Sequence, residues 1–200
     1  MINIAVKGRK YAGKDTVGSV LIDGFLYKRV SFATPLKRMI SVLLEEAGYD
    51  EDEIERMVDG DKKEIPVPEL GGKTTRFCMQ TLGTEWRDMI HKTLWVDIAK
   101  RKISNLNDSG EDVVVTDLRF PHEAEALRHP AQDDLFDPFF IVEVVRPGSS
   151  TGNGEKHASE TLQDAIEADA IIMNTGTIAD LSASVDDVVD YFIDQDGNNN

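Results

Sequence analysis

Cysteine is almost absent from this sequence. Cys78 is the single cysteine in 200 residues, so no disulfide can form within the chain. Long apolar runs are absent too, because no stretch approaches the roughly 20 residues needed to cross a bilayer. Lys7 and Gly8 interrupt the first apolar segment, which is too short for a secretory signal. Together these absences predict a protein of the reducing cytoplasm without a membrane partner.

Positive charge is also scarce. The chain has 22 Lys and Arg against 37 Asp and Glu, a net charge of −15. A surface of this sign repels DNA, RNA and anionic membranes, which argues against a DNA-binding accessory protein. It is compatible with a small phosphorylated ligand, provided that basic side chains gather locally. The four histidines show no metal-ligand spacing and indicate no histidine relay.

The length and the 40% hydrophobic content predict one α/β domain with a sizeable core. We expect this domain to span residues 1–194 and the tail over 195–200 to be disordered. Strands are predicted over 3–7, 29–33, 112–116, 139–145 and 170–173, with helices between them, and those over 3–7 and 112–116 are expected to be buried. The charged segment 50–72 has little periodicity, so it predicts either a mobile flap over a substrate or a plain surface excursion.

The first strand leads straight into a glycine-rich loop. Gly8 and Gly13 are five residues apart and Lys14 follows, which is most of the phosphate-binding pattern G-x-x-x-x-G-K-[ST]. Such glycines let backbone N–H groups point at one anion, beside the positive end of the next helix and the lysine charge. The pattern therefore predicts a polyphosphate site, and the alternative is that the glycines only shape a tight turn. The predicted cofactor-binding residues here are Gly8, Lys10, Ala12, Gly13, Lys14, Asp15 and Thr16.

One position departs from that pattern. Asp15 follows the lysine where a metal-binding Ser or Thr is usual, and Thr16 comes one place later. Either Asp15 supplies a carboxylate near the metal or the catalytic hydroxyl, or Thr16 takes the metal role through a small shift. Both alternatives remain open.

Two further groups follow predicted strands. Asp117 and Arg119 come after the strand over 112–116, and Arg146 comes after the strand over 139–145. Ligands of parallel α/β sheets bind beyond the carboxyl ends of strands. Asp117 is thus predicted to hold Mg²⁺ or to orient an acceptor, and Arg119 to clamp a transferred phosphate, unless the two form a structural ion pair. Arg146 precedes a Ser/Gly-rich loop, so a closing lid over about 146–166 is predicted, and an ordinary linker is the alternative.

A second anion site is predicted at the start of the next helix. Thr34 is the expected N-cap, with Pro35 in the first turn, and the helix ends near Gly48. Lys37 and Arg38 lie off its apolar stripe, where they either bind an anion or face solvent. Helix signals resume from Thr74 to about Leu106, and a final helix begins near Ile178.

Taken in order, these motifs resemble the phage-type deoxynucleoside monophosphate kinases of the P-loop kinase superfamily. The matching stretches cover nearly the whole chain: Gly13-Lys14-Asp15-Thr16, Pro35-Leu36-Lys37, Met79 to Thr84, Trp95-Val96, Val115 to Arg119 with His122-Glu123, Val144 to Gly148, His157 with Glu160, and Asn174-Thr175-Gly176. The resemblance implies an α/β three-layer P-loop kinase fold, with a five-stranded parallel sheet flanked by helices. It also implies transfer of the γ-phosphate of ATP, with Mg²⁺, to a deoxynucleoside 5′-monophosphate.

The same resemblance assigns roles to residues. It implies an acceptor-binding or flap region over about 34–95, which contains Arg76, Gln80 and Thr84, and it adds Glu160 to the substrate-binding residues and Asn174 and Gly176 to the ATP site. Catalysis then falls to Lys14, Asp15, Asp117, Arg119 and Arg146, and metal binding to Asp15, Thr16 and Asp117. A phage gene would place the protein in the host cytoplasm, and a homodimer is compatible with the sequence. The competing interpretations are a P-loop kinase for another phosphorylated acceptor, such as phosphomevalonate, and a non-catalytic nucleotide-binding regulator.

Overall fold

The apolar segment near the start of the chain forms strand β1 (Asn3–Lys7), the central strand of a five-stranded sheet with the order β2-β5-β1-β6-β7. The other strands are β2 (Lys28–Val30), β5 (Val113–Val115), β6 (Phe139–Val145) and β7 (Ala170–Met173). All neighbouring pairs are parallel, with Ile4 opposite Val114 on one side and Phe140 on the other. The predicted five-stranded parallel sheet is therefore confirmed.

The computed structural model describes residues 1–130, 136–148 and 162–198. These residues divide into two compact units: unit 1 combines Met1–Ser31 with the chain from Ala99 onward, and unit 2 is the segment Phe32–Ile98. Unit 2 covers nearly the same residues as the predicted acceptor-binding region, about 34–95. The single domain over 1–194 stays a prediction.

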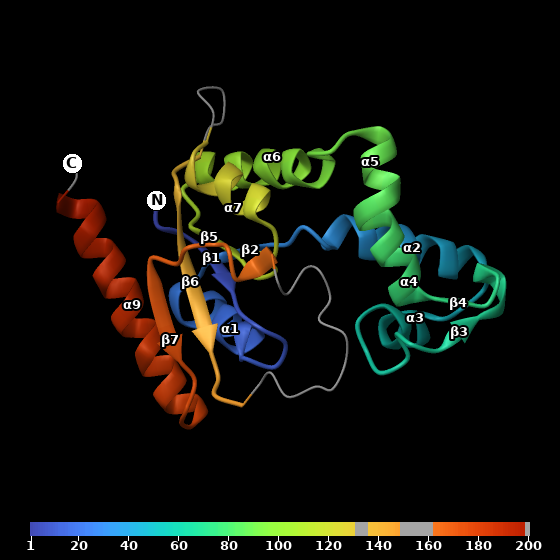
Figure 1. Cartoon of the computed structure of the whole chain (residues 1–200), viewed down its shortest axis with the longest axis horizontal. Helices are drawn as coiled ribbons and strands as arrows, with labels where there is room; N and C mark the ends of the chain where they lie inside the picture. Colours follow the sequence, from blue (N-terminus) through green and yellow to red (C-terminus); the bar gives the residue numbers. More distant parts are fainter. Residues whose placement is uncertain (131–135, 149–161, 199–200) are drawn as a thin grey trace. The chain divides into compact units, whose positions relative to one another are not determined.

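Helices cover both faces of the sheet in unit 1, which gives three layers (Figure 1). Helices α1 (Lys14–Phe25) and α9 (Ile178–Asn198) pack on one face, and α7 (Pro121–Arg128) packs against β6 on the other. Alternate strand residues such as Ile4 and Val6 face α1 and α9, where a buried cluster also contains Leu21, Val144 and Phe192. Among the described residues, no helix is long and apolar enough to span a membrane.

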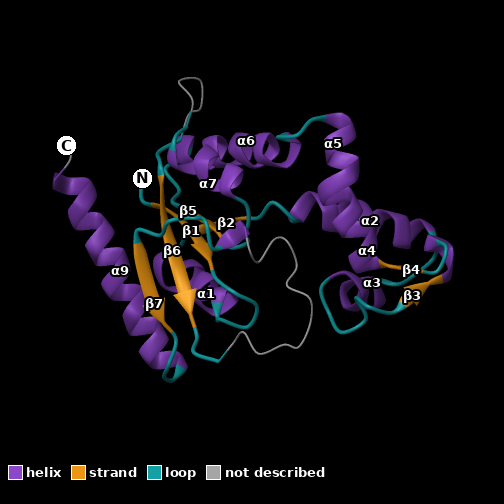
Figure 2. Cartoon of the chain, viewed as in Figure 1, coloured by secondary structure: helices purple, strands orange, loops and turns teal. Residues whose placement is uncertain are grey.

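Unit 2 is mostly helical (Figure 2). It contains α2 (Thr34–Glu46), α3 (Glu51–Val58), the short strands β3 (Pro66–Val67) and β4 (Lys73–Thr74), the 3₁₀ turn η1 (Pro68–Leu70), α4 (Thr75–Thr81), the π-helix η2 (Leu82–Trp86) and α5 (Arg87–Ile90). Helix α6 (Leu94–Asp108) begins in unit 2 and continues in unit 1. The core of unit 2 is formed by Ile40, Leu44, Met57, Val58 and Val67.

Two local predictions were wrong. Thr34 is already the first residue of α2, and Ala33 is the N-cap. The helix can begin one residue early because the N–H groups of a first turn have no partner within the helix, so Pro35 costs nothing there. Helix α9 also continues to Asn198, into the tail predicted to be disordered from 195. Once a helix is formed, each added residue gains a backbone hydrogen bond, so the helix extends past the last residue of its apolar stripe.

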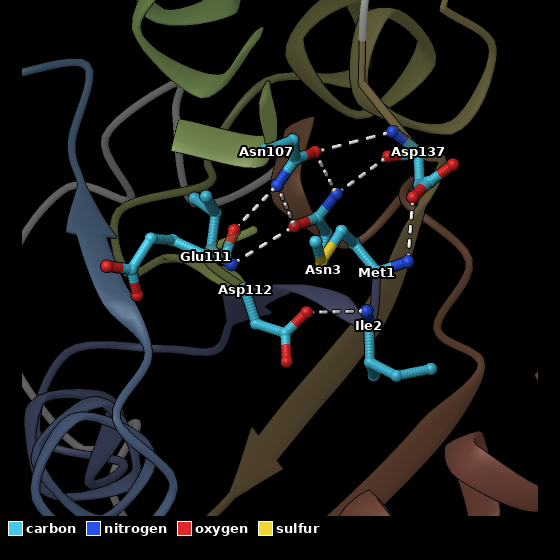
Figure 3. Close-up of polar contacts among 8 residues, drawn as sticks. Met1, Ile2, Asn3, Asn107, Glu111, Asp112 and Asp137 are labelled. Atoms are coloured by element: carbon cyan, nitrogen blue, oxygen red, sulfur yellow. Dashed lines mark hydrogen bonds and ion pairs between the residues drawn. The ribbon is translucent and has the colours of Figure 1, made fainter. Parts of the chain in front are cut away.

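A pair of asparagines fixes the amino ends of β1 and β5 (Figure 3). Asn3 is fully buried; its Nδ2 donates to Asn107 Oδ1 at 2.8 Å and to the Asp137 carbonyl at 2.9 Å, and its Oδ1 accepts from Val113 N at 3.0 Å. Asn107 Nδ2 returns a bond to Asn3 Oδ1 and donates to the Glu111 carbonyl. Because both amides use donor and acceptor, they can be buried without an unsatisfied group.

Candidate active site

The loop between β1 and α1 has the backbone of a phosphate cradle. Gly8 has φ +148°, Tyr11 +65° and Gly13 +105°, so the loop turns through conformations that L side chains rarely adopt. A Cβ on Gly8 would stand 2.5 Å from the Val144 carbonyl oxygen of β6. Position 8 therefore requires glycine for two reasons: its positive φ, and the lack of room for a Cβ beside β6.

The mouth of this loop is electropositive. Gly13 is the N-cap of α1 and brings no side-chain acceptor, so the positive end of the helix is left to an external anion. Lys14 Nζ donates to the Arg9 carbonyl at 2.8 Å, which keeps its charge beside the loop. On the other side, Asn174 Nδ2 donates to the Ala12 carbonyl at 2.8 Å. The loop, Lys14 and Asn174, which sequence reasoning placed in one site, are together in the structure.

Asp15 lies in the first turn of α1 and is 92% exposed. Its Oδ1 is 3.6 Å from a guanidinium nitrogen of Arg29, and Arg29 Nε donates to Thr116 Oγ1 at 2.9 Å. Thr116 is buried directly after β5, so it fixes the arginine that faces Asp15. Thr16, the alternative metal residue, is half-buried in the same turn. Sequence reasoning missed Arg29, since its only signal was a cation on a short strand.

The segment after β5 presents Asp117 and Arg119. Ser31 Oγ donates to Asp117 Oδ2 at 2.8 Å, so this carboxylate is held by the residue that follows β2. Glu123 Oε2 accepts from the backbone N–H groups of Arg119 and Phe120, both at 2.9 Å. Phe120 is the N-cap of α7 and has no side-chain acceptor, so only the glutamate half of a capping box forms.

Glu123 is an unusual carboxylate. Its pKa is raised from 4.5 to about 7, and the largest cause is burial. The two backbone N–H donors lower the pKa, and of the nearby charges Asp117 raises it and the Arg119 guanidinium lowers it. A buried carboxylate with two backbone donors holds a turn rigidly. The sequence analysis gave Glu123 no role. Its position as the third residue of α7 is nevertheless typical of a glutamate that caps the start of a helix.

All predicted residues of unit 1 that the structure describes lie at one edge of the sheet. The phosphate loop follows β1, Asp117 and Arg119 follow β5, Arg146 follows β6 as an exposed residue, and Asn174 and Gly176 follow β7. Carboxyl ends of parallel strands meet at one edge, so these residues face the same region. Lys10 is exposed beside the Tyr11 ring, 4.9 Å from its centroid. Glu160 and most of the predicted lid over about 146–166 lie outside the described residues.

The predicted acceptor residues of unit 2 lie on α2 and on the helical run from α4 into η2. Lys37 Nζ is 2.5 Å from Asp59 Oδ1, and Arg76 pairs with Glu64. Arg38 and Gln80 are exposed, and Thr84 Oγ1 donates to the Gln80 carbonyl at 2.8 Å. Thr84 belongs to the π-helix, a distortion often found at functional sites. Their role in binding stays a prediction.

The donor set can be compared with what a nucleotide and its metal need. Among the described residues, no group of three or more His, Cys, Asp or Glu side chains could hold a metal ion. Mg²⁺ in kinases usually takes one or two protein carboxylates and completes its shell with phosphates and water. Asp15, Asp117 and the Thr16 hydroxyl fit that requirement, and the loop fits a polyphosphate.

Comparison with known proteins connects these residues to kinases. A family model described as deoxynucleotide monophosphate kinase matches residues 71–185. The chain is 27% identical over 204 residues to a protein of Acanthamoeba polyphaga mimivirus provisionally described as a deoxynucleotide monophosphate kinase, covering 95% of this chain and 97% of that protein. It is 25% identical over 212 residues to the deoxynucleoside-5′-monophosphate kinase of Escherichia phage T5, covering 79% of this chain and 83% of that protein. A solved structure of a provisionally assigned kinase from Chloroflexus aurantiacus has a TM-score of 0.50 at 14% identity and covers 96% of both chains, a likeness of fold.

Proposed function

Because the chain belongs to the deoxynucleotide monophosphate kinase family, we propose that it transfers the γ-phosphate of ATP to the 5′-phosphate of a deoxynucleoside monophosphate. The observation that carries this proposal is the cradle between β1 and α1. There a glycine with no room for a side chain, a helix N-terminus without a side-chain cap and the Lys14 charge belong to one loop, which is what binding of a phosphate needs. The strand-end residues Asp117 and Arg119 belong to the same sheet edge.

Phosphoryl transfer needs positioning and compensation of negative charge more than covalent chemistry. Lys14 and the backbone N–H groups of the loop would bind the β- and γ-phosphates, and Asn174 and Gly176 would border the ATP site. Arg119 and Arg146 would offset charge on the migrating group. The acceptor is itself a phosphate and is largely ionised near pH 7, so no strong general base is required.

Asp15 or Thr16, with Asp117, would hold Mg²⁺, which would neutralise phosphate charge when it is bound with the nucleotide. Arg29 faces Asp15, so it would keep this carboxylate oriented in the free enzyme. In unit 2, Lys37, Arg38, Arg76, Gln80 and Thr84 would contact the acceptor. Lys37 and Arg76 now pair with Asp59 and Glu64, and such exposed ion pairs are weak, about 0–1 kcal/mol, so a phosphate can replace them.

The test is ADP release from ATP and Mg²⁺ with dAMP, dCMP, dGMP, dTMP or 5-hydroxymethyl-dCMP as acceptor, and phosphomevalonate in parallel. We expect turnover with at least one deoxynucleotide and none with phosphomevalonate. ATP binding without turnover on any nucleotide would contradict the proposal and favour a non-catalytic nucleotide binder. Light scattering of the same sample tests the homodimer, which stays a proposal, as does the cytoplasmic location.

A further inference from the structure

Lys7 is a buried cation that the proposed chemistry does not use. It is the last residue of β1 and is 2% exposed. Its Nζ donates to the backbone carbonyls of Ile166 and Gln163 and lies 3.1 Å from Glu143 Oε2 on the neighbouring strand β6. A buried ammonium needs such partners to compensate for its lost hydration. Lys7 therefore fixes the segment 163–166 against the carboxyl end of the central strand.

Gln163, within that segment, is also buried, at 7% exposure. Its Nε2 donates to the Leu118 carbonyl at 2.8 Å, and the two residues are 45 positions apart in the chain. Leu118 is fully buried and stands between Asp117 and Arg119. The Gln163 side chain therefore contacts the backbone between two predicted catalytic residues, Asp117 and Arg119.

The segment 117–120 after β5 is thus held by three side chains of unit 1. Ser31 donates to the Asp117 carboxylate, and Gln163 donates to the Leu118 carbonyl. Glu123 accepts from the N–H groups of Arg119 and Phe120. The Ser31 bond can adapt because a hydroxyl rotates, whereas the Gln163 and Glu123 bonds fix backbone atoms. Fixing the backbone on both sides of Arg119 limits where its guanidinium can reach.

We propose that Gln163, held in place by Lys7, is a positioning residue for phosphoryl transfer, acting through the Leu118 carbonyl on Asp117 and Arg119. This inference rests on the proposed kinase function. Gln163 touches neither substrate nor cofactor in this proposal. Its effect is on geometry, and small misplacements of catalytic groups can reduce a rate by about 100-fold.

The experiment compares Gln163→Leu with Asn107→Leu. Both remove a side-chain amide, buried in Gln163 and half-buried in Asn107, and leave a backbone carbonyl without its donor, Leu118 in one case and Glu111 in the other. Asn107 lies at the opposite end of the strands, next to Asn3 (Figure 3), so it serves as a control for lost stability. We expect both variants to melt a few degrees below the wild type. Only Gln163→Leu should lower kcat, by about 10- to 100-fold, with the KM for ATP changed less than about twofold.

Equal kcat in Gln163→Leu and wild type would overturn the inference, and so would an equal loss in both variants. An inactive wild type would contradict the proposed function itself and would be seen before any variant is compared. If Gln163→Leu does not fold, Gln163→Met keeps the length of the side chain while removing the donor and should show the same fall in kcat; a wild-type kcat there also overturns the inference. Lys7→Met tests whether Lys7 acts through Gln163. If it does, the double variant Lys7→Met/Gln163→Leu should lose little more kcat than Gln163→Leu alone, whereas a loss equal to the product of the two single losses would contradict the role of Lys7.

Discussion

Replacing Glu123 with glutamine should remove a pH dependence of stability that this one buried carboxyl group imposes. Burial, the largest cause, raises the pKa of Glu123 from 4.5 to about 7 in the folded protein. Between these two pH values the folded state binds a proton that the unfolded chain has already lost. Linkage then requires that the contribution of Glu123 to stability is full below pH 4.5 and decreases as the pH rises through 7.

The size follows from the two pKa values. The interval from 4.5 to about 7 is 2.5 pKa units, and each unit is worth ~1.4 kcal/mol, so the whole effect is ~3.5 kcal/mol. Between pH 5 and pH 8, where unfolding can be measured, the contribution of Glu123 to the free energy of unfolding should fall by ~2.5 kcal/mol. Glutamine keeps the shape and one acceptor oxygen for the Arg119 and Phe120 N–H groups but does not titrate.

The assay is urea unfolding of wild type and variant at several pH values from 5 to 8. The difference in free energy of unfolding, wild type minus Glu123→Gln, should decrease by ~2.5 kcal/mol as the pH rises. Taking the difference cancels the titration of the other carboxylates of this acidic chain. Glu125→Gln, which removes an exposed carboxylate from the same helix, is the matched control. A flat difference for Glu123→Gln would refute the reasoning.

Three further predictions concern the phosphate loop. Lys14→Ala should reduce turnover by orders of magnitude at an unchanged circular dichroism spectrum, and a wild-type rate of ADP release would remove the central assignment. Asp15→Asn should weaken the Mg²⁺ dependence of the rate, whereas an unchanged Mg²⁺ titration would assign the metal role to Thr16. Gly8→Ala should abolish ATP binding in calorimetry and destabilise the fold, because a Cβ there meets the Val144 carbonyl at 2.5 Å. The control is Gly24→Ala, where no atom lies within 4 Å of the added carbon. It should bind ATP normally, and its free energy of unfolding in urea should rise by ~0.5–1 kcal/mol.

Much of unit 1 could be predicted because its signals are local. Strands β6 and β7 are nearly continuous apolar runs, so they have the bounds expected from sequence, 139–145 and 170–173, although Ile171 and Met173 of the edge strand β7 are exposed. The phosphate loop combines glycines, a lysine and a preceding strand within a few residues. The edge that gathers Asp117, Arg146 and Asn174 then follows from parallel strands alone.

The supporting contacts could not be predicted because they join distant parts of the chain. Ser31 meets Asp117 across 86 positions and Arg29 meets Thr116 across 87, since β2 lies next to β5. Periodicity within a window carries no information on such pairs. Unit 2 was difficult for another reason: β3 and β4 have two residues each, too few for an alternating pattern.

The central position of β1 has a consequence for how the chain is made. Its five residues are all buried, yet its neighbours are β5, which begins at Val113, and β6, which begins at Phe139. At about 5–20 residues per second, a ribosome needs roughly 5–20 s after β1 before the first of these partners appears. Unit 2 is a single stretch that is complete at residue 98, so it can fold during that wait. Strand β1 thus has no neighbouring strand of its sheet until β5 and β6 are made, and pausing between residues 99 and 139 should promote aggregation of the nascent chain.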